Sequence, residues 1–368
     1  SGTLAELLGS WALPMDIELR TLGIRRAAEA SQAVLSAESL LWLEGYAEGV
    51  NAFLNDTSLP LPPEYEVLEL TREGIPPWTI TDSLVISKGL SFSFAFDLSD
   101  IENTFLLNAF QASGSALGFD GAALFFEDLF RSAPFDPALS ISGHAGEVSS
   151  LQLATAAETS SRASYLTTKT AQLAGSYMDR IAGIPMLRDA LRPNESSRGS
   201  NVWAVRGSLT ASGSPMMAAD PHLGVNTPAV FHEARLCVKS GEQILLNVAG
   251  VGVPGSPESR QGCNSCICWS STVGSLDMTD VYQEEIVIDP GTGLPSATLF
   301  EGTPESLIAI PQTFYVNQIG DSMWNNLSDA GVAPPAGGVT LVVPRRNHGP
   351  LIAIDPGDAV GLSLQYAG

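Results

Sequence analysis

Ser200 is the residue whose setting most clearly suggests covalent chemistry, because it follows Gly199 and precedes Asn-Val-Trp. Cleavage of the bond between Gly199 and Ser200 would give the serine a free α-amine. One residue would then hold both a hydroxyl nucleophile and a base, since an α-amine with a pKa near about 8 is partly neutral at physiological pH. Gly-Ser alone is a weak signal, because the dipeptide recurs along the chain. A serine in a turn is the alternative interpretation.

The residues after Ser200 supply the context that the dipeptide lacks. Four short segments carry it: Ser200-Asn-Val-Trp203, Asp220-Pro221-His222, Pro254-Gly255 and Trp269-Ser-Ser-Thr-Val273. Together they resemble the penicillin acylase family, a group of N-terminal nucleophile hydrolases that includes acyl-homoserine-lactone acylases. The resemblance is densest between Gly199 and Glu285. It implies an α+β fold of the N-terminal nucleophile hydrolase type, an αββα sandwich that is incomplete here, with a helical N-terminal half and with truncation at both ends.

The resemblance implies a role for each catalytic candidate. Ser200 would attack an amide carbonyl and form an acyl-enzyme that water hydrolyses. Val273 occupies the position of a backbone N–H donor to the oxyanion, and loss of one such donor costs about 2.7 to 4 kcal/mol. His222 occupies the position after Asp-Pro that contacts the nucleophile's surroundings, although an isolated histidine is more often structural. Gly199 would permit the strained backbone that self-cleavage requires.

The family also uses an asparagine side chain as a second oxyanion donor, beyond the strand that begins at Asn347-His-Gly-Pro. No asparagine lies between Gly349 and Gly368. The implied function is an amidohydrolase that cleaves the N-acyl bond of a small molecule, such as a β-lactam side chain or an acyl-homoserine lactone, through Ser200 after autocleavage behind Gly199. The alternative is an inactive or incomplete fragment that keeps the fold without turnover.

Three residues align with acyl-pocket positions of the family: Phe94, Leu223 and Ser271. Leu223 stands where penicillin-G-type acylases carry an aromatic residue. The resemblance therefore favours an aliphatic acyl chain over a phenylacetyl group. The shape of such a pocket also depends on residues that the motifs do not locate.

Asp277, Thr279 and Asp280 resemble the calcium loop of the same family, in which two carboxylates and a carbonyl oxygen come from one turn. Asp100 is in register with a carboxylate ligand from the first half of the family sequence, and Glu102 is the reserve. Calcium takes about 6 to 8 oxygen ligands, so waters or further residues would complete the shell. The expected cofactor is a structural Ca²⁺ ion that holds the two halves together. Acidic residues on a solvated loop are the alternative.

The four cysteines are unevenly placed, since Cys263, Cys266 and Cys268 lie within six residues and Cys237 lies apart. Cys263 and Cys266 have the CxxC spacing of a metal site. No second pair or nearby histidine completes the four ligands of a structural zinc ion. The favoured interpretation is that the cysteines are small buried hydrophobic residues in a strand that leads to Trp269. Zinc is the less favoured alternative.

The charge of the chain excludes several classes of partner. The 40 acidic and 18 basic residues give a formal net charge of −22, which repels phosphate backbones and anionic lipid surfaces. No apolar run approaches the roughly 18 to 20 residues of a membrane-spanning helix. The expected partner is a small N-acyl amide substrate, with neither nucleic acid nor membrane. The resemblance adds two self-derived chains held together after processing, and a periplasmic or secreted protein whose leader would lie upstream.

The pattern of apolar residues changes from helical to strand-like along the chain. We predict a helical half (1–165), a spacer or linker (166–199) and a strand-rich half (200–368), which together indicate an α+β fold. Thr79 and Asp82 have the spacing of a capping box, so a long helix should run from there to about residue 96, with another over 102–112. β-rich runs predict strands at residues 202–205, 216–218, 244–251, 267–269, 281–288 and 339–343.

Overall fold

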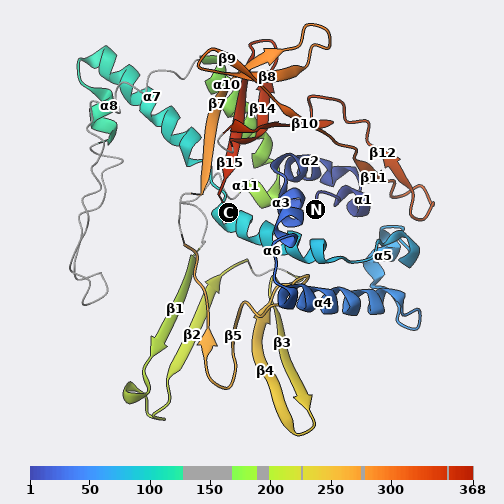
Figure 1. The fold of residues 1–368 in the computed structure, drawn as a ribbon. Helices are drawn as coiled ribbons and strands as arrows, with labels where there is room; N and C mark the ends of the chain where they lie inside the picture. The colour runs from blue at the N-terminus through green and yellow to red at the C-terminus, as the bar shows by residue number, and fades with distance from the viewer. Residues whose placement is uncertain (127–167, 189–198, 225–226, 275–277, 346–347, 368) are drawn as a thin grey trace.

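Helices form the first half of the chain and antiparallel strands form the second (Figure 1). The computed structural model describes residues 1–126, 168–188, 199–224, 227–274, 278–345 and 348–367. Its α-helices are α1 (Ala5–Leu8), α2 (Leu13–Leu22), α3 (Ile24–Gln32), α4 (Ala37–Asn55), α5 (Pro63–Val67), α6 (Ile80–Ala95), α7 (Ser99–Leu117), α8 (Gly121–Leu124), α10 (Thr168–Ala182) and α11 (Pro185–Arg188). The predicted α+β class is confirmed.

The described strands form one large sheet and three small ones, all antiparallel. The large sheet has the order β10-β13-β14-β15-β7-β8-β9, with β7 (Thr279–Ile288), β8 (Pro295–Phe300), β9 (Thr303–Ser306), β10 (Ile308–Pro311), β13 (Val339–Val343), β14 (Gly349–Asp355) and β15 (Val360–Tyr366). The small sheets are β1 (Gly199–Val205) with β2 (Met216–His222), β3 (His232–Ser240) through β4 (Gln243–Gly252) and β5 (Gln261–Cys263) to β6 (Cys268–Trp269), and β11 (Tyr315–Asn317) with β12 (Leu327–Asp329). Each of the six predicted strands falls on one of these elements, although β6 is a residue shorter than predicted.

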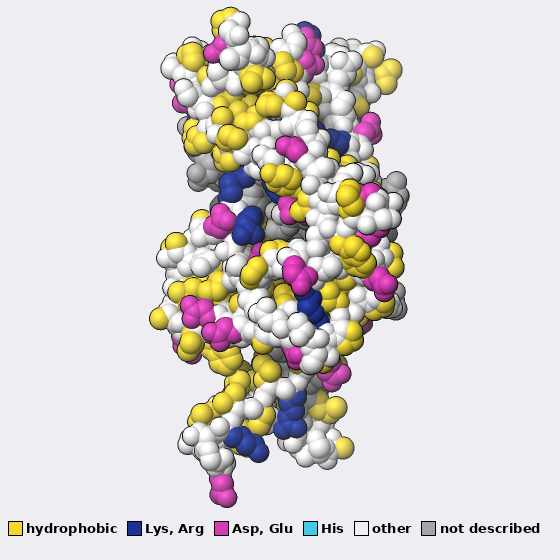
Figure 2. Space-filling view, turned by 90° about the vertical axis from the view of Figure 1, so that its right-hand side faces the viewer, with side chains coloured by type: hydrophobic (Ala, Val, Ile, Leu, Met, Phe, Trp, Pro, Cys, Tyr) yellow, Lys and Arg dark blue, Asp and Glu magenta, His cyan; other side chains and the backbone are white. Residues whose placement is uncertain are grey.

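The hairpins β1–β2 and β3–β4 extend away from the large sheet, on the other side of the helices (Figure 1). In the space-filling view they form the slender lower end of the molecule, with apolar side chains on the surface (Figure 2). These exposed side chains include Val202, Trp203, Leu236, Val238 and Ile244. Burial in the described structure is therefore concentrated where the helices meet the large sheet.

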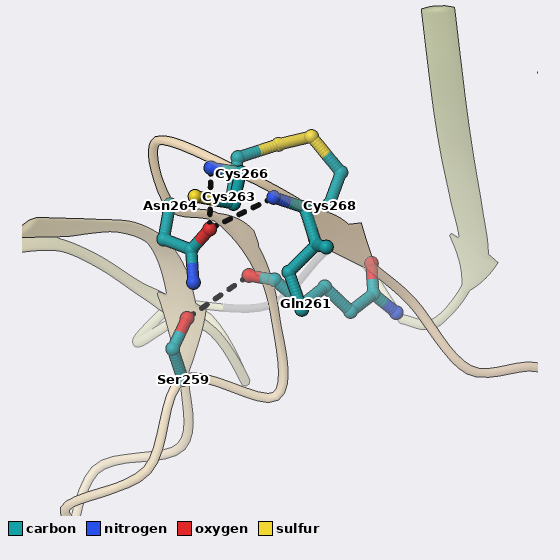
Figure 3. The surroundings of a disulfide bond; sticks show 7 residues. Ser259, Gln261, Cys263, Asn264, Cys266 and Cys268 are labelled. Atoms are coloured by element: carbon teal, nitrogen blue, oxygen red, sulfur yellow. Dashed lines mark hydrogen bonds between the residues drawn. A yellow bond between two sulfur atoms is a disulfide. The ribbon is translucent and has the colours of Figure 1, made fainter. Parts of the chain in front are cut away.

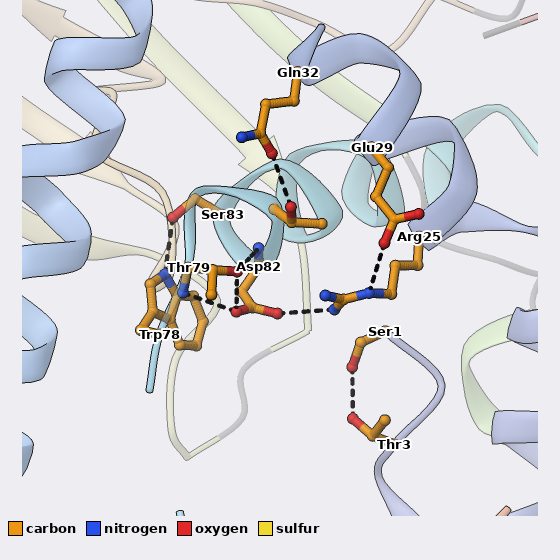
Figure 4. Close-up of polar contacts among 10 residues, drawn as sticks. Ser1, Thr3, Arg25, Glu29, Gln32, Trp78, Thr79, Asp82 and Ser83 are labelled. Atoms are coloured by element: carbon orange, nitrogen blue, oxygen red, sulfur yellow. Dashed lines mark hydrogen bonds and ion pairs between the residues drawn. The ribbon is translucent and has the colours of Figure 1, made fainter. Parts of the chain in front are cut away.

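Helix α6 begins where the sequence predicts, because its first turn is capped by side chains. The Thr79 hydroxyl accepts the backbone N–H of Asp82 at 3.3 Å, and the Asp82 carboxylate accepts the backbone N–H of Thr79 at 2.9 Å, which completes a capping box (Figure 4). Asp82 also forms an ion pair with Arg25 at 3.1 Å, which ties the start of α6 to α3. The following helix, α7, is longer at both ends than predicted.

The main core lies between α3, α6, α10 and the strands β14 and β15. Phe92 of α6 is 1% exposed, stacks on Phe96 with ring centroids 4.6 Å apart, and meets the edge of Tyr366 from β15 at 5.1 Å. Ala28 of α3 and Ile181 of α10 complete the same cluster. Burying an aromatic side chain of this size contributes about 1.5–3 kcal/mol, so Phe92 is a principal anchor of α6 on the sheet.

A buried carboxylate joins α2, α10 and β14. Glu18 is 2% exposed; the Tyr177 hydroxyl donates to it at 2.8 Å, and Arg180 pairs with it at 3.1 Å. Arg180 also donates to the carbonyl of Ile352 in β14 at 2.6 Å. Burial raises the pKa of Glu18, while Arg180 and Tyr177 lower it. The charged groups thus connect the helices to the sheet through bonds that offset part of their desolvation cost.

Most of the described part of the predicted spacer, 166–199, is a helix of the core. Ala174, Tyr177 and Ile181 of α10 are buried, and their spacing places them on one helical face. This apolar stripe is narrow, which is why the composition of the segment suggests a linker. Residues 189–198 lie outside the described residues.

A second buried carboxylate, Glu284, organises the large sheet. It accepts the hydroxyl of Ser363 at 2.8 Å, contacts Nδ1 of His348 at 2.8 Å, and pairs with Arg345 at 3.0 Å. His348 stacks on Tyr282 at 3.8 Å. The serine bonds the carboxylate and not the histidine, so the group lacks the serine–histidine contact of a catalytic triad. Its role is to join β7, β14 and β15.

We predict that Glu18→Gln changes the pH dependence of stability. Because the folded-state pKa of Glu18 is raised, its protonation contributes stability that is fully present below the unfolded pKa of about 4.3 and is lost as pH rises through the folded pKa. Glutamine does not titrate. The free energy of unfolding of the wild type, measured by urea titration at several pH values, should therefore fall relative to that of the variant as the pH rises above the unfolded pKa.

The matched control is Glu29→Gln, since Glu29 is a half-exposed carboxylate of α3. Its profile, measured under the same conditions, separates the loss of a buried carboxylate from the loss of an exposed one. Parallel profiles for the wild type and Glu18→Gln would show that Glu18 does not cause this pH dependence of stability.

Candidate active site

Ser200 lies on β1, beside the carbonyl of the bond that the sequence analysis expects to break. β1 pairs with β2 so that Gly199 is opposite His222 and Ser200 is opposite Pro221. The Ser200 hydroxyl donates a hydrogen bond to the Gly199 carbonyl oxygen, 2.6 Å away. The candidate nucleophile therefore contacts the carbonyl group that self-cleavage would attack.

Glycine at position 199 leaves room for a side chain of the neighbouring strand. A Cβ at that position would lie 3.1 Å from Nδ1 of His222 on the neighbouring strand. The strained backbone expected at Gly199 stays a prediction. The ring of His222 is partly exposed, and its Nε2 lies 3.3 Å from the carboxylate of Asp220. The ring of His222 therefore lies beside Gly199 across the hairpin, and its catalytic role stays a prediction.

A cavity of about 240 Å³ has Ser200 in its wall. Phe94, Ser271 and Val273 line the same cavity. The structure thus brings together the candidate nucleophile, the candidate oxyanion donor and two of the three predicted acyl-pocket residues. Leu223, the third, is not among the described residues that line it.

One face of α6 forms a wall of this cavity. Leu90, Ser91, Phe94 and Ala95 line it, and their spacing places them on one side of a helix. Phe92 lies about 200° round the axis from Phe94 and is buried in the core. The packing of one face of α6 therefore sets the position of the other.

Arg260 is a site residue that the sequence analysis missed. Among the described residues that line the Ser200 cavity it is the only charged one, and it also lines an adjoining cavity of about 420 Å³ that contains Lys88. One end of its guanidinium pairs with Glu258 at 3.1 Å, whereas its buried Nε has no partner among the described residues. No motif marks this arginine, because its role depends on the fold of β4 and β5. Phe231 and Gln261 are further lining residues without a sequence signal.

The segment that carries Val273 leaves β6 at the cavity. Trp269 ends that strand, and its indole N–H donates to the carbonyl of Ser259 at 3.0 Å. Within the described part of the chain, no group accepts a hydrogen bond from the backbone N–H of Val273. An amide without an internal acceptor, in the wall of the cavity that holds Ser200, is suited to donate to an oxyanion.

The cysteines do not behave as the sequence analysis predicts. Cys263 and Cys268 form a disulfide, whereas Cys237 and Cys266 are free and exposed (Figure 3). The prediction of small buried hydrophobic residues is wrong, because Cys263 and Cys268 are directly opposite on β5 and β6 and their side chains meet across the strands. The zinc alternative also fails, since the disulfide uses two of its three thiol ligands. Among the described residues no group of three or more metal-binding side chains is found.

The predicted calcium residues are only partly within the described structure. The carboxylate of Asp100, at the start of α7, accepts the backbone N–H of Val281 at 3.0 Å, so Asp100 reaches the end of β7 that carries Thr279 and Asp280. Thr279 is buried with its hydroxyl unpartnered, and Asp280 is exposed. Asp277 lies outside the described residues. No group of three acidic, histidine or cysteine side chains is found here among the described residues, and the calcium site stays a prediction.

Burial raises the pKa of Glu102, the reserve ligand, and the neighbouring Asp97 raises it further. A cation bound near the start of α7 would reduce the repulsion between these two carboxylates. The carboxylate of Asp97 already accepts the backbone N–H of Ser99 at 3.1 Å.

Comparison with known proteins identifies the family. A model of the penicillin amidase family matches residues 1–368. The chain belongs to the penicillin amidase family. This confirms the resemblance drawn from the motifs around Ser200 and, with the mixed architecture described above, the fold class.

Two curated relatives illustrate the range of the family. The acyl-homoserine lactone acylase QuiP of Pseudomonas aeruginosa is 28% identical over 289 residues, which cover 77% of this chain and 29% of that protein. The penicillin acylase 2 proenzyme of a Pseudomonas species is 25% identical over 365 residues, covering 99% of this chain and 39% of that protein. The chain thus spans less than half the length of either relative.

A thermostable penicillin G acylase from Alcaligenes faecalis is similar among solved structures, with 20% identity, 45% of this chain and 25% of that chain covered, and a TM-score of 0.33. None of the described helices of the penicillin amidase chain combines the length and the apolar character needed to cross a bilayer.

We predict that alanine substitutions at two positions of α6 lower the stability by different amounts, because the two side chains lie on different faces of the helix. Phe92→Ala should lower the free energy of unfolding by about 3–5 kcal/mol, because it leaves a void in the core. Phe94→Ala should cost markedly less, because that side chain is only partly buried in the wall of an open cavity. Urea unfolding measures both values, and equal losses would show that α6 does not divide its faces in this way.

Proposed function

We propose that this chain carries the nucleophile of an amidohydrolase that cleaves the N-acyl bond of a small molecule. The proposal rests on one observation, which is that Ser200 and Val273 line the same small cavity. A nucleophile and a preorganised backbone donor are what acyl transfer from an amide requires. Membership of the penicillin amidase family supports the proposal, and the names of both relatives describe acylases.

Maturation would create the base. The Ser200 hydroxyl attacks the carbonyl carbon of Gly199, the bond from that carbon to the Ser200 nitrogen breaks, and water hydrolyses the resulting ester. The products are a carboxylate on Gly199 and a free α-amine on Ser200. The 2.6 Å hydrogen bond between the hydroxyl and the Gly199 carbonyl supports this step, as does the word proenzyme in the name of one relative.

Turnover would then use the amine and the hydroxyl of one residue. The α-amine of Ser200 takes the hydroxyl proton as the oxygen bonds to the substrate carbonyl carbon, and the Val273 amide donates to the oxyanion. The protonated amine passes its proton to the leaving nitrogen as the carbon–nitrogen bond breaks. Water repeats the sequence on the acyl-enzyme and releases the acid.

The cavity wall supports a hydrocarbon acyl group. Leu90, Phe94 and Phe231 give it an apolar lining, and Ser271 adds a hydroxyl. Leu223 no longer contributes to this argument, because it lies outside the wall. We therefore propose an apolar acyl group, carried by either an acyl-homoserine lactone or an N-acylated β-lactam. The rim of the cavity carries the positive charge of Arg260.

Contacts across the cleavage point support the proposal that the two products stay together. Arg180 precedes Gly199 in sequence, yet it donates to the carbonyl of Ile352 at 2.6 Å, and Phe92 packs on Tyr366. These contacts do not involve the bond that would break.

The disulfide between Cys263 and Cys268 supports a periplasmic or secreted location, because such bonds persist in oxidising compartments.

We further propose that Ca²⁺ bound by Asp100, Asp277, Thr279 and Asp280 reinforces the junction of the two halves. Asp100 precedes the cleavage point and its carboxylate already bonds the backbone of β7, which follows it. A cation held by both sides would add to that contact. It would serve structure and take no part in the chemical steps.

The proposed maturation is tested by intact mass. The wild type should yield pieces 1–199 and 200–368, whereas Ser200→Ala should stay whole because it lacks the attacking oxygen. Ser208→Ala is the control, since Ser208 also follows a glycine but lies in the turn of the β1–β2 hairpin, and it should be processed like the wild type. Scission that persists in Ser200→Ala would assign the nucleophile elsewhere.

An uncut wild type would favour the alternative, a chain that keeps the fold without turnover. Incubation with an N-acyl-homoserine lactone and an acylated β-lactam, followed by detection of the free amine, then separates maturation from hydrolysis. Hydrolysis by the wild type and none by Ser200→Ala is the expected result.

The calcium proposal is tested by thermal unfolding with and without chelator. Added Ca²⁺ should raise the midpoint, since a ligand at about 100 times its dissociation constant contributes about 2.7 kcal/mol. Asp280→Asn should weaken the response. Glu285→Gln is the control, because Glu285 is an exposed acid on the same strand, and it should respond like the wild type. An equal midpoint with calcium and with chelator would refute the site.

A further inference from the structure

The hairpin β5–β6 supplies both flanks of a wall of the Ser200 cavity. Arg260 and Gln261 line the cavity where β5 begins, and residues 271–274 line it where the chain leaves β6. The disulfide between Cys263 and Cys268 lies at the other end of the hairpin, next to the turn (Figure 3). The spacing between the two flanks therefore depends on how β5 and β6 are held together.

Few interactions hold β6 in place. It is the edge strand of its sheet and pairs with β5 at only two positions, Gly262 with Trp269 and Cys263 with Cys268. The hydrogen bond from the Trp269 indole to Ser259 is a further contact. A two-stranded pairing of this length is marginal in water. β5 is more firmly placed, because it also pairs with β4 at three positions.

A free thiol lies inside the loop that the disulfide closes. Cys266 is exposed and stands three residues after Cys263 and two before Cys268. The side chain of Asn264 accepts the backbone N–H groups of Cys266 and Ile267, both at 2.8 Å, which forms a tight turn around the thiol. The other free thiol, Cys237, is on β3, where it is opposite Asn247 of β4.

We propose that the Cys263–Cys268 disulfide positions the segment that carries Val273, and that Cys266 can release this segment by thiol–disulfide exchange. The proposal rests on the role proposed above for the Val273 amide. In the paired form the cross-link holds β6 against β5, so that residues 271–273 face Ser200. In the exchanged form Cys268 is free and only backbone pairing and one indole hydrogen bond hold the strand.

The exchange needs no external oxidant. The Cys266 thiol loses its proton, its sulfur attacks the sulfur of Cys263, and the bond between Cys263 and Cys268 breaks. Cys268 leaves as a thiolate and takes up a proton. One disulfide and one thiol are present before and after, so atoms and electrons balance. The product pair has CxxC spacing, which a single turn can accommodate.

Disulfide mapping tests the exchange. The full chain is incubated at pH 8.5 and at pH 5, quenched with acid and alkylated, and its peptides are identified by mass spectrometry. Thiol–disulfide exchange proceeds by attack of a thiolate, so a higher pH favours it. We expect the wild type to acquire the Cys263–Cys266 pair at pH 8.5, and Cys266→Ser to keep Cys263–Cys268 alone. Cys237→Ser should behave like the wild type. A wild type that shows only Cys263–Cys268 at pH 8.5 overturns the exchange.

Amide hydrogen exchange tests the positioning without relying on activity. Cys268→Ser should accelerate exchange in the peptide that covers residues 267–274 relative to Cys266→Ser, in which the disulfide is intact. Peptides of the large sheet should exchange equally in both variants, which controls for general unfolding. Equal exchange in the 267–274 peptide would overturn the positioning role.

Kinetic measurements test whether the Cys263–Cys268 disulfide affects the proposed hydrolysis. Val273→Pro, which lacks the amide N–H, should lower kcat about 100- to 1000-fold, and Cys268→Ser should lower it about tenfold with little change in KM. Cys266→Ser should have a kcat at least as high as the wild type, because it keeps the Cys263–Cys268 pair. An unchanged kcat in Cys268→Ser overturns the positioning role. An unchanged kcat in Val273→Pro instead refutes the proposed oxyanion donor and leaves the mapping and hydrogen-exchange results standing.

Discussion

Burial of Phe92 is the interaction on which the arrangement of this chain most depends. The ring is packed between Phe96 of the same segment and Tyr366 of β15, so it fixes α6 against the large sheet. A helix cannot rotate one face without the other. The faces that bury Phe92 and present Phe94 to the Ser200 cavity are therefore set together. Helix α6 therefore belongs both to the core and to the wall of the candidate site.

Buried carboxylates connect separate elements of the fold. Glu18 and Glu284 are both nearly inaccessible, which is costly in a chain whose net charge is already −22. The desolvation cost of each carboxylate is offset by an arginine and by a hydroxyl donor. These partners lie outside the element that carries the carboxylate. Such groups stabilise only when all their donors are in place, so they favour one arrangement of helices and strands over looser ones.

Local features of this fold were predictable from the sequence, and features that depend on register were not. The capping box at Thr79 and the β1–β2 strands follow from short-range spacing, and both are observed. The disulfide requires Cys263 and Cys268 to be opposite one another, which no sequence pattern fixes. Arg260 likewise reaches the cavity only because β5 pairs with β4.

The distinction between local and register-dependent features also applies to Ser200 and Val273. Ser200 contacts the Gly199 carbonyl because the two residues are covalently adjacent, so that contact withstands movement of the rest of the chain. Val273 meets the cavity only through a strand of two residues at the edge of a sheet. An oxyanion donor loses most of its effect when it is displaced by a fraction of an ångström, because its contribution depends on preorganisation. The proposed self-cleavage would therefore depend on local contacts, whereas the proposed turnover would depend on a strand that is remote in sequence and weakly paired. A covalent cross-link next to that strand is a direct physical means of holding it.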